Sequence, residues 1–242
     1  MKHLGPRLLP FLGMLALLFA CATAGPLGFR SGEALHGMVY AKDGRPLGGV
    51  TILCQGRPVA ESDSQGRFAF PPPARADASA TVQFSKPGYE RVSAELRFAD
   101  RSQVLHARLR SGEDLLAESL ELHSQGCQAE SRALAAAALE ADQGLAAARF
   151  LMAALRYRAG EHQEALAALD ALRAGGVDHP FCDLLEADIA EYGLRDWRRA
   201  AAALGRFLSV RDDPGVERRL EVLVGAAQDP ANDGQSRMGA EP

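Results

Sequence analysis

Residues 63–70 read DSQGRFAF, a cluster of turn-forming residues followed by two phenylalanines at alternate positions. The alternation places both rings on one face of a β-strand. The turn before them could hold a cation or form a hairpin corner. A calcium loop needs oxygen ligands at several alternate positions, and Gln65 interrupts that series. Because Asp63 can accept hydrogen bonds from backbone amides and Gly66 can adopt a positive φ, the stretch predicts a hairpin corner.

Short alternating runs of apolar residues continue on both sides of this corner, over residues 36–110. Clusters of glycine, proline and aspartate separate the runs. Strands are expected over 37–41, 50–54, 59–62, 68–70, 81–85, 90–98 and 104–109. About seven short strands at this spacing indicate a β-sandwich.

Four motifs that begin with glycine mark the same stretch. They are Gly37-Met38-Val39, Gly44-Arg45-Pro46-Leu47-Gly48-Gly49-Val50-Thr51-Ile52, Gly66-Arg67-Phe68-Ala69-Phe70 and Gly88-Tyr89. In this order they resemble the pattern of the carboxypeptidase regulatory-like family, a prealbumin-like β-sandwich. The resemblance implies a fold for this part of the chain and no activity, because such domains usually accompany another module. The family name does not make the chain a peptidase.

Residues 112–227 change to a helical pattern that is rich in alanine and glutamate. Gly126 and Gly160 are 34 residues apart, and Ala165 and Ala200 are 35 apart. A period of this length is typical of stacked helical hairpins. In such a stack, small residues are needed where two helices cross closely.

The segment 160–166, GEHQEAL, resembles the turn between the two helices of a tetratricopeptide repeat. Residues 194–201 resemble the same turn without its glycine, with Trp197 at the aromatic position. The resemblance implies an α-solenoid of three helix–turn–helix units over 112–145, 146–180 and 181–214. A capping helix is expected after Pro214, with an apolar stripe formed by Val216, Leu220 and Leu223. A helical array of another kind is the alternative. The fold class expected for the whole chain is therefore an all-β sandwich followed by an all-α solenoid.

Residues 1–24 have the form of a secretory signal peptide, with basic residues, an apolar run over 8–20 and then small residues. Cleavage after Ala24 would follow an A-x-A site and release a soluble protein. Cleavage before Cys21 would follow a sequence that resembles a bacterial lipobox, Leu18-Phe19-Ala20-Cys21, and would attach lipid to the cysteine sulfur. We favour the lipoprotein, whose acyl chains would anchor it at a membrane.

The export segment predicts a location in the cell envelope, as an outer-membrane lipoprotein facing the periplasm or as a soluble periplasmic protein. Residues 25–35 are expected to form a linker, and the polar residues 228–242 a disordered tail. The formal net charge of −4 and the lack of basic runs argue against nucleic acid as a partner. Membrane association is expected only through lipid on Cys21.

The sequence offers no arrangement that points to catalysis: it contains no G-x-S-x-G, no H-E-x-x-H and no glycine-rich phosphate loop. His162-Gln163-Glu164 matches one part of a zinc deaminase motif, but the accompanying P-C-x-x-C is missing. His36 and His106 could meet if the first and last strands pair, yet no third metal ligand is evident. The three cysteines after Cys21 have no C-x-x-C spacing, and free thiols are favoured over a disulfide. We expect no enzyme activity, no metal and no cofactor.

The first helices of the three units would line a concave groove. The expected groove positions are mostly apolar or aromatic: Leu116, Leu120, His123, Phe150, Tyr157, Arg158, Leu185, Ile189 and Tyr192. Such a surface suits a peptide or a helix. The alternative is that Phe150, Leu185 and Ile189 pack between neighbouring helices.

These observations favour a non-enzymatic envelope adaptor that binds a protein or peptide partner through the groove. Two other functions stay open. One is a carbohydrate- or peptidoglycan-binding protein that uses the sandwich, and the other is an accessory subunit of a secreted enzyme.

Overall fold

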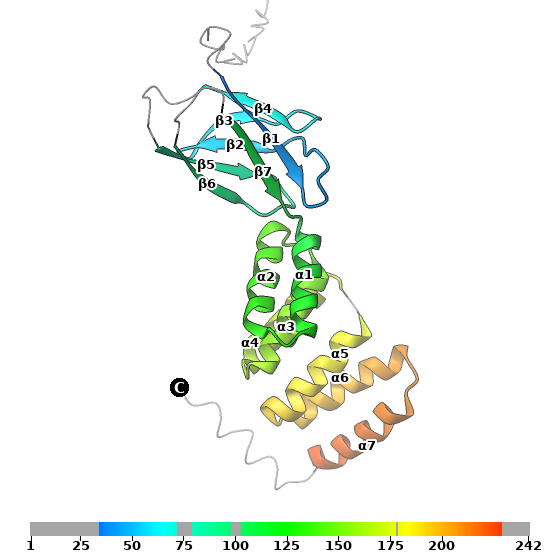
Figure 1. Cartoon of the computed structure of the whole chain (residues 1–242). Helices are drawn as coiled ribbons and strands as arrows, with labels where there is room; N and C mark the ends of the chain where they lie inside the picture. Colours follow the sequence, from blue (N-terminus) through cyan, green and yellow to red (C-terminus); the bar gives the residue numbers. More distant parts are fainter. Residues whose placement is uncertain (1–33, 72–78, 98–102, 178, 229–242) are drawn as a thin grey trace, which may run out of the picture.

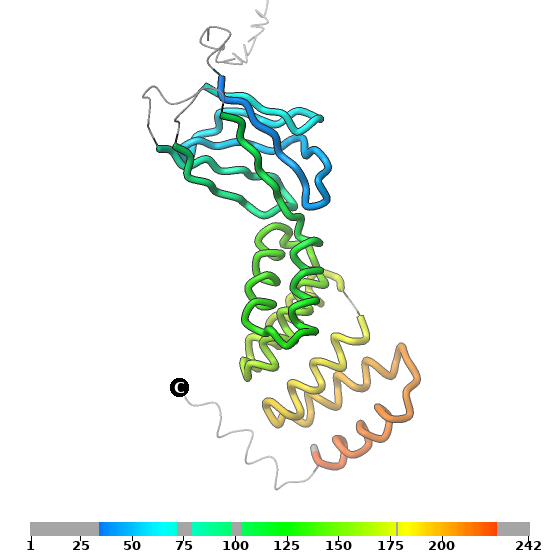
Figure 2. Tube along the Cα trace, viewed as in Figure 1, coloured from blue at the N-terminus to red at the C-terminus, as the bar shows by residue number. Residues whose placement is uncertain are grey.

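The computed structural model describes residues 34–71, 79–97, 103–177 and 179–228. A β-sandwich forms the N-terminal part, and a helical array follows it along the chain (Figure 1). The trace in Figure 2 shows that the array begins at one end of the sandwich. The predicted signal peptide, the lipid site at Cys21, the linker up to residue 33 and the tail from residue 229 lie outside the described residues.

Seven strands form two sheets in the described part of the chain. They are β1 (Leu35–Ala41), β2 (Thr51–Cys54), β3 (Arg57–Glu61), β4 (Arg67–Phe70), β5 (Ser79–Ser85), β6 (Val92–Arg97) and β7 (Val104–Leu109). One sheet has the order β4-β1-β7, in which β1 and β7 are parallel, and the other has the antiparallel order β3-β2-β5-β6. The predicted β-sandwich is confirmed.

The sandwich core lies between the two sheets. In β4, Phe68 and Phe70 are buried whereas Arg67 and Ala69 are exposed, as the alternation in the sequence predicts. The ring of Phe68 meets that of Phe84, from the other sheet, edge to face with the centroids 5.7 Å apart. The stretch that predicts the hairpin therefore also supplies aromatic side chains to the centre of the core.

The turn before β4 is a hairpin corner, as predicted. One carboxylate oxygen of Asp63 accepts hydrogen bonds from the backbone amides of Gln65 and Arg67, both at 2.9 Å. The other accepts from Arg67 Nε at 3.0 Å. These bonds, chiefly the one from the Arg67 amide, hold the pKa of Asp63 below its ordinary value. Gly66 has a φ of +72°, so both residues serve the turn.

Within the described residues, the array consists of three helical pairs and a further helix. The helices are α1 (Gly112–Ser124), α2 (Gln128–Ala141), α3 (Ala146–Arg158), α4 (His162–Ala174), α5 (Pro180–Asp188), which continues into the π-helix η1 (Ile189–Leu194), α6 (Trp197–Val210) and α7 (Pro214–Gln228). Ala138, Ala165 and Ala200 are fully buried, as expected for residues at helix crossings. The predicted all-α part is confirmed.

The helix α7 covers the last pair. Leu223 is buried, and Val216 and Leu220 pack against the same cluster, which includes Ala203 and Leu204 of α6. The apolar stripe predicted for a capping helix is therefore confirmed.

The third pair contains one residue more than the second. Ala153 and Ala187 are both fully buried and 34 residues apart, whereas Ala165 and Ala200 are 35 apart. The additional residue thus enters between Ala187 and Ala200. The π-helix η1 lies in this interval and can accommodate it, because π hydrogen bonds span five residues instead of four.

Gly88, in the loop between β5 and β6, joins the sandwich to the array. Its N–H donates to the carbonyl of Ala141 at the end of α2 (3.1 Å), and its carbonyl accepts from the amide of Gly112 (3.0 Å). The guanidinium of Arg110 pairs with Glu90 in the same loop and with Glu118 on α1, both at 2.7 Å. Backbone hydrogen bonds and ion pairs together hold this end of the sandwich to the array.

Candidate functional site: the groove face of the helical array

The first helices of the three pairs, α1, α3 and α5, are connected by two polar contacts. Arg158 Nη1 on α3 lies 3.4 Å from His123 Nε2 on α1. The Tyr157 hydroxyl on α3 donates to the backbone carbonyl of Asp188 on α5 at 3.4 Å. We define the groove face as the surface that these three helices share.

Three of the predicted groove residues are exposed. Leu120 and Tyr192 are 49% and 65% exposed, and Arg158 is exposed beside His123. The Tyr192 ring also lies 5.3 Å from the guanidinium of Arg219 on α7. The exposed parts of the three side chains are available to a partner.

Tyr157 contributes to the connection between helices more than to a free surface. Its hydroxyl bonds to α5, and its ring lies 5.7 Å from that of His162. Burial, followed by the negative charge of Asp188, raises the pKa of Tyr157 above its ordinary value. The phenol therefore stays protonated and able to donate at neutral pH.

The remaining apolar predictions take part in packing to different degrees. Ile189 is fully buried beside Leu166 and Leu169, so it does not contact a partner. Leu116, Phe150 and Leu185 are half-buried against the array's core clusters. The interpretation that these residues pack between neighbouring helices is therefore correct for Ile189. It is correct in part for Leu116, Phe150 and Leu185.

The register of the third pair explains the position of Ile189. Since Ala153 and Ala187 are equivalent, the residue equivalent to Phe150 is Leu184, one position before the predicted Leu185. The predicted groove positions of the third pair apply the interval of 35 residues already at Leu185, whereas the additional residue enters only after Ala187. With the corrected register, the residue of the third pair that is equivalent to Ala147 is Phe181.

Phe181 lines an apolar cavity of about 260 Å³ between α3, α4 and α5. Its other walls include Ala147, Phe150, Leu172 and Cys182. Phe181 is 50% exposed, and the guanidinium of Arg211 lies 5.9 Å from its ring centroid. The sequence carried no signal for Phe181, because Ala147, the residue 34 positions earlier, is not among the predicted groove residues.

The sandwich brings His36 and His106 to one face without completing a metal site. β1 and β7 do pair, with His106 opposite Met38 and His36 opposite Val104. Within the described ranges, no group of three or more His, Cys, Asp or Glu side chains could hold a metal ion. Among the described residues, Cys54, Cys127 and Cys182 are not joined in a disulfide.

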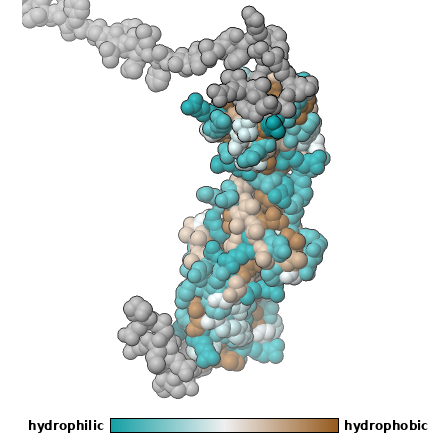
Figure 3. All heavy atoms as spheres, turned by 60° about the vertical axis from the view of Figure 1, so that its left-hand side comes forward, coloured by the Kyte–Doolittle hydropathy of each residue, from teal (hydrophilic) through white to brown (hydrophobic). Residues whose placement is uncertain are grey.

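Apolar surface is also visible in Figure 3, over the middle of the molecule where the helices next to the sandwich lie. Among the described residues, no helix has the length and apolar character needed to cross a membrane.

No protein-family model matches the sequence, and no curated protein matches it. Among solved structures, the chain is similar to the type III secretion chaperone SycD of Yersinia enterocolitica, solved with a peptide of the translocator YopD. The identity is 14%, the match covers 47% of this chain and 89% of that one, and the TM-score is 0.42. A cohesin–X-dockerin complex from Acetivibrio cellulolyticus matches at 19% identity, with 38% and 72% coverage and a TM-score of 0.25. TM-scores this low do not establish a shared fold.

Proposed function

We propose that the chain is a non-enzymatic adaptor of the bacterial cell envelope, and that its groove face holds a protein or peptide partner. The observation that carries this proposal is the exposure of large apolar side chains on the first helices of the array. Leu120 and Phe181 are 49% and 50% exposed. Phe181 also borders an apolar cavity.

These features suit a partner that inserts an apolar side chain. Covering apolar surface contributes about 25 cal/mol per Å², and an anchor that fills a desolvated pocket contributes most of the binding energy. The cavity beside Phe181 offers such a pocket. Arg211 lies beside the Phe181 ring and would favour an acidic segment next to the anchor.

We expect the double substitution Leu120→Ser/Phe181→Ser to weaken partner binding at least about tenfold, because it removes two exposed apolar contacts. The measurement is affinity capture from native envelopes with a C-terminal tag, followed by titration of the captured partner. Val222→Ser is the matched control, since Val222 is 72% exposed on α7 and outside the groove face.

The control variant should bind as wild type does, and all three proteins should unfold at similar temperatures. A partner that binds the double variant with unchanged affinity would place the site elsewhere on the molecule. A captured enzyme whose activity depends on this chain would identify the partner as that enzyme.

The envelope location rests on the sequence of residues 1–24. We expect the full-length chain, expressed in a Gram-negative host, to incorporate labelled fatty acid and to sediment with membranes. Cys21→Ala should abolish the label and release the protein into the soluble periplasmic fraction. If the wild-type protein is unlabelled and soluble, cleavage follows the A-x-A site at Ala24 instead.

Binding of glycans by the sandwich is supported by one feature. Tyr40 stacks on His106 with the ring centroids 6.1 Å apart and the planes at 14°. Tyr89, a second tyrosine of the sandwich, packs against the core and therefore offers no second stacking platform. The adaptor function is therefore the better supported of the two.

A further inference from the structure

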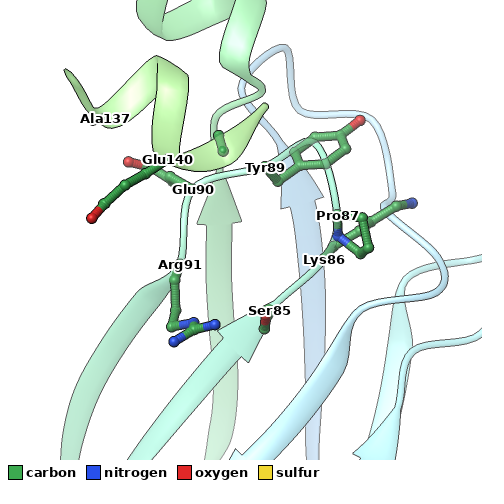
Figure 4. A pocket seen from close by; sticks show the side chains of 9 residues that line it. Ser85, Lys86, Pro87, Tyr89, Glu90, Arg91, Ala137 and Glu140 are labelled. Carbon is green, nitrogen blue, oxygen red and sulfur yellow. The ribbon is translucent and has the colours of Figure 1, made fainter. Parts of the chain in front are cut away.

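A second cavity, of about 560 Å³, lies where the sandwich meets the array (Figure 4). It is formed by the loop between β5 and β6 and by the C-terminal end of α2. Its size is in the range of small-molecule sites, which often occur between domains. The hydrogen bond from Gly88 to the Ala141 carbonyl fixes its two walls relative to each other.

Two of the charged groups around this cavity already form hydrogen bonds within the chain. Lys86 Nζ donates to the carbonyl of Gly48 at 2.6 Å and lies 5.3 Å from the Tyr89 ring centroid. The Glu90 carboxylate accepts hydrogen bonds from Arg110 Nε and Nη2 at 2.9 and 2.7 Å. Lys86 thus fixes the loop against the sandwich, and Glu90 fixes it to Arg110, which precedes α1.

Three other polar groups in the lining have no hydrogen-bond or ion-pair partner in the described chain: the Ser85 hydroxyl, the Arg91 guanidinium and the Glu140 carboxylate. Phe84 and Val92 pair across β5 and β6, and the buried ring of Phe84 points into the sandwich. Because side chains alternate, Ser85 and Arg91 point to the outer face at the same end of the sheet.

Glu140 stands in an electrostatically unfavourable position. It lies in the last turn of α2, and that turn contains no basic residue. A carboxylate near the negative end of a helix dipole is destabilising. A cationic group bound in the cavity would be favoured both by the carboxylate and by the helix end.

We propose that this cavity binds a small zwitterion, namely an amino acid or a short peptide with free ends. The carboxylate of the ligand pairs with the Arg91 guanidinium and the Ser85 hydroxyl, and its ammonium group pairs with Glu140. The small side chains of Ala137 and Ala141 leave room for the ligand between these ends. This site is separate from the groove face and does not depend on the adaptor function.

The test is isothermal titration of the full chain with three matched probes: trialanine, N-acetyl-trialanine and trialanine amide. Trialanine should bind, and each of the other two should bind at least tenfold more weakly, since each lacks one charge. Arg91→Gln should abolish the preference for trialanine over its amide. Glu140→Gln should abolish the preference for trialanine over its N-acetyl form.

Two control variants carry the same substitutions outside the cavity: Arg57→Gln on β3 and Glu130→Gln on α2, both at exposed positions. They should bind all three probes as wild type does. Equal affinity for the three probes, or trialanine binding weaker than about 10 mM, would overturn the proposal. So would an unchanged probe preference in both cavity variants.

Discussion

Replacing Gly66 with alanine is expected to destabilise the sandwich by about 3 kcal/mol or more, the sum of a backbone cost and a steric cost. Gly66 has a φ of +72°, which costs an alanine about 1 kcal/mol or slightly more. An added Cβ would also overlap the Val39 carbonyl oxygen and approach the Leu47 amide nitrogen to 3.1 Å. These backbone groups hydrogen-bond to each other at 2.9 Å, so neither can move away without breaking that bond.

Gly44→Ala is the matched control for this prediction. Gly44 has a similar φ of +84°, but an added Cβ would meet nothing within 4 Å. Gly44→Ala should therefore lower the free energy of unfolding by the backbone cost alone, about 1 kcal/mol. The measurement is denaturant unfolding followed by circular dichroism for the sandwich and by the fluorescence of Trp197 for the array. If both variants lost the same free energy of unfolding, the close approach of the added Cβ to the Val39 carbonyl would not destabilise the sandwich.

The sequence predicts those parts of the structure that depend on local pattern. The alternation around Phe68 and the turn chemistry of Asp63 identify the hairpin, because strand pleating and turn geometry involve only neighbouring residues. The buried alanines that recur at intervals of 34 and 35 residues identify the helical pairs in the same way.

The sequence does not predict features that depend on where an irregularity lies. The interval of 35 between Ala165 and Ala200 shows that one residue is added, but not where it enters. Its position after Ala187 decides that Ile189 is buried and that Phe181 takes the position equivalent to Ala147. The cavity beside Gly88 is also beyond sequence reasoning, because its walls come from parts of the chain about 50 residues apart.

The burial of the charged residues Asp183 and Glu186 could not be predicted from the sequence either. On a helix they would be expected at a solvated face, yet only 4% and 3% of their surface is exposed. Arg173 from α4, and Arg199 and Arg206 from α6, surround them. The burial of the two acids thus depends on cations of two neighbouring helices.

Removing Glu186 should therefore have a large effect on the array. Its carboxylate accepts from Arg173 Nη2 and Arg206 Nη2 at 2.6 Å and from Arg199 Nε at 2.8 Å. Deleting one partner of a buried, hydrogen-bonded ion pair typically costs about 3–5 kcal/mol. The three arginines keep contact with solvent and with Asp170 or Asp183, so the expected cost lies at the lower end, about 3 kcal/mol. We expect Glu186→Ala to lower the free energy of unfolding of the array by this amount, measured by Trp197 fluorescence in denaturant. Glu164→Ala, at an exposed position on α4, is the control and should change stability by less than about 0.5 kcal/mol.

The pH dependence provides an independent test of the same cluster. Burial raises the pKa of Glu186, but the hydrogen bonds from Arg173 and Arg199 and the charge of Arg206 outweigh it, so the net pKa lies below the ordinary 4.5. A group whose pKa is lowered by folding stabilises the protein above its unfolded-state pKa and loses that contribution as the pH falls. Wild type should therefore lose stability relative to Glu186→Gln as the pH falls below about 4.5. A stability difference between the two proteins that stays constant from neutral pH into this acid range would show that the charge of Glu186 does not stabilise the array.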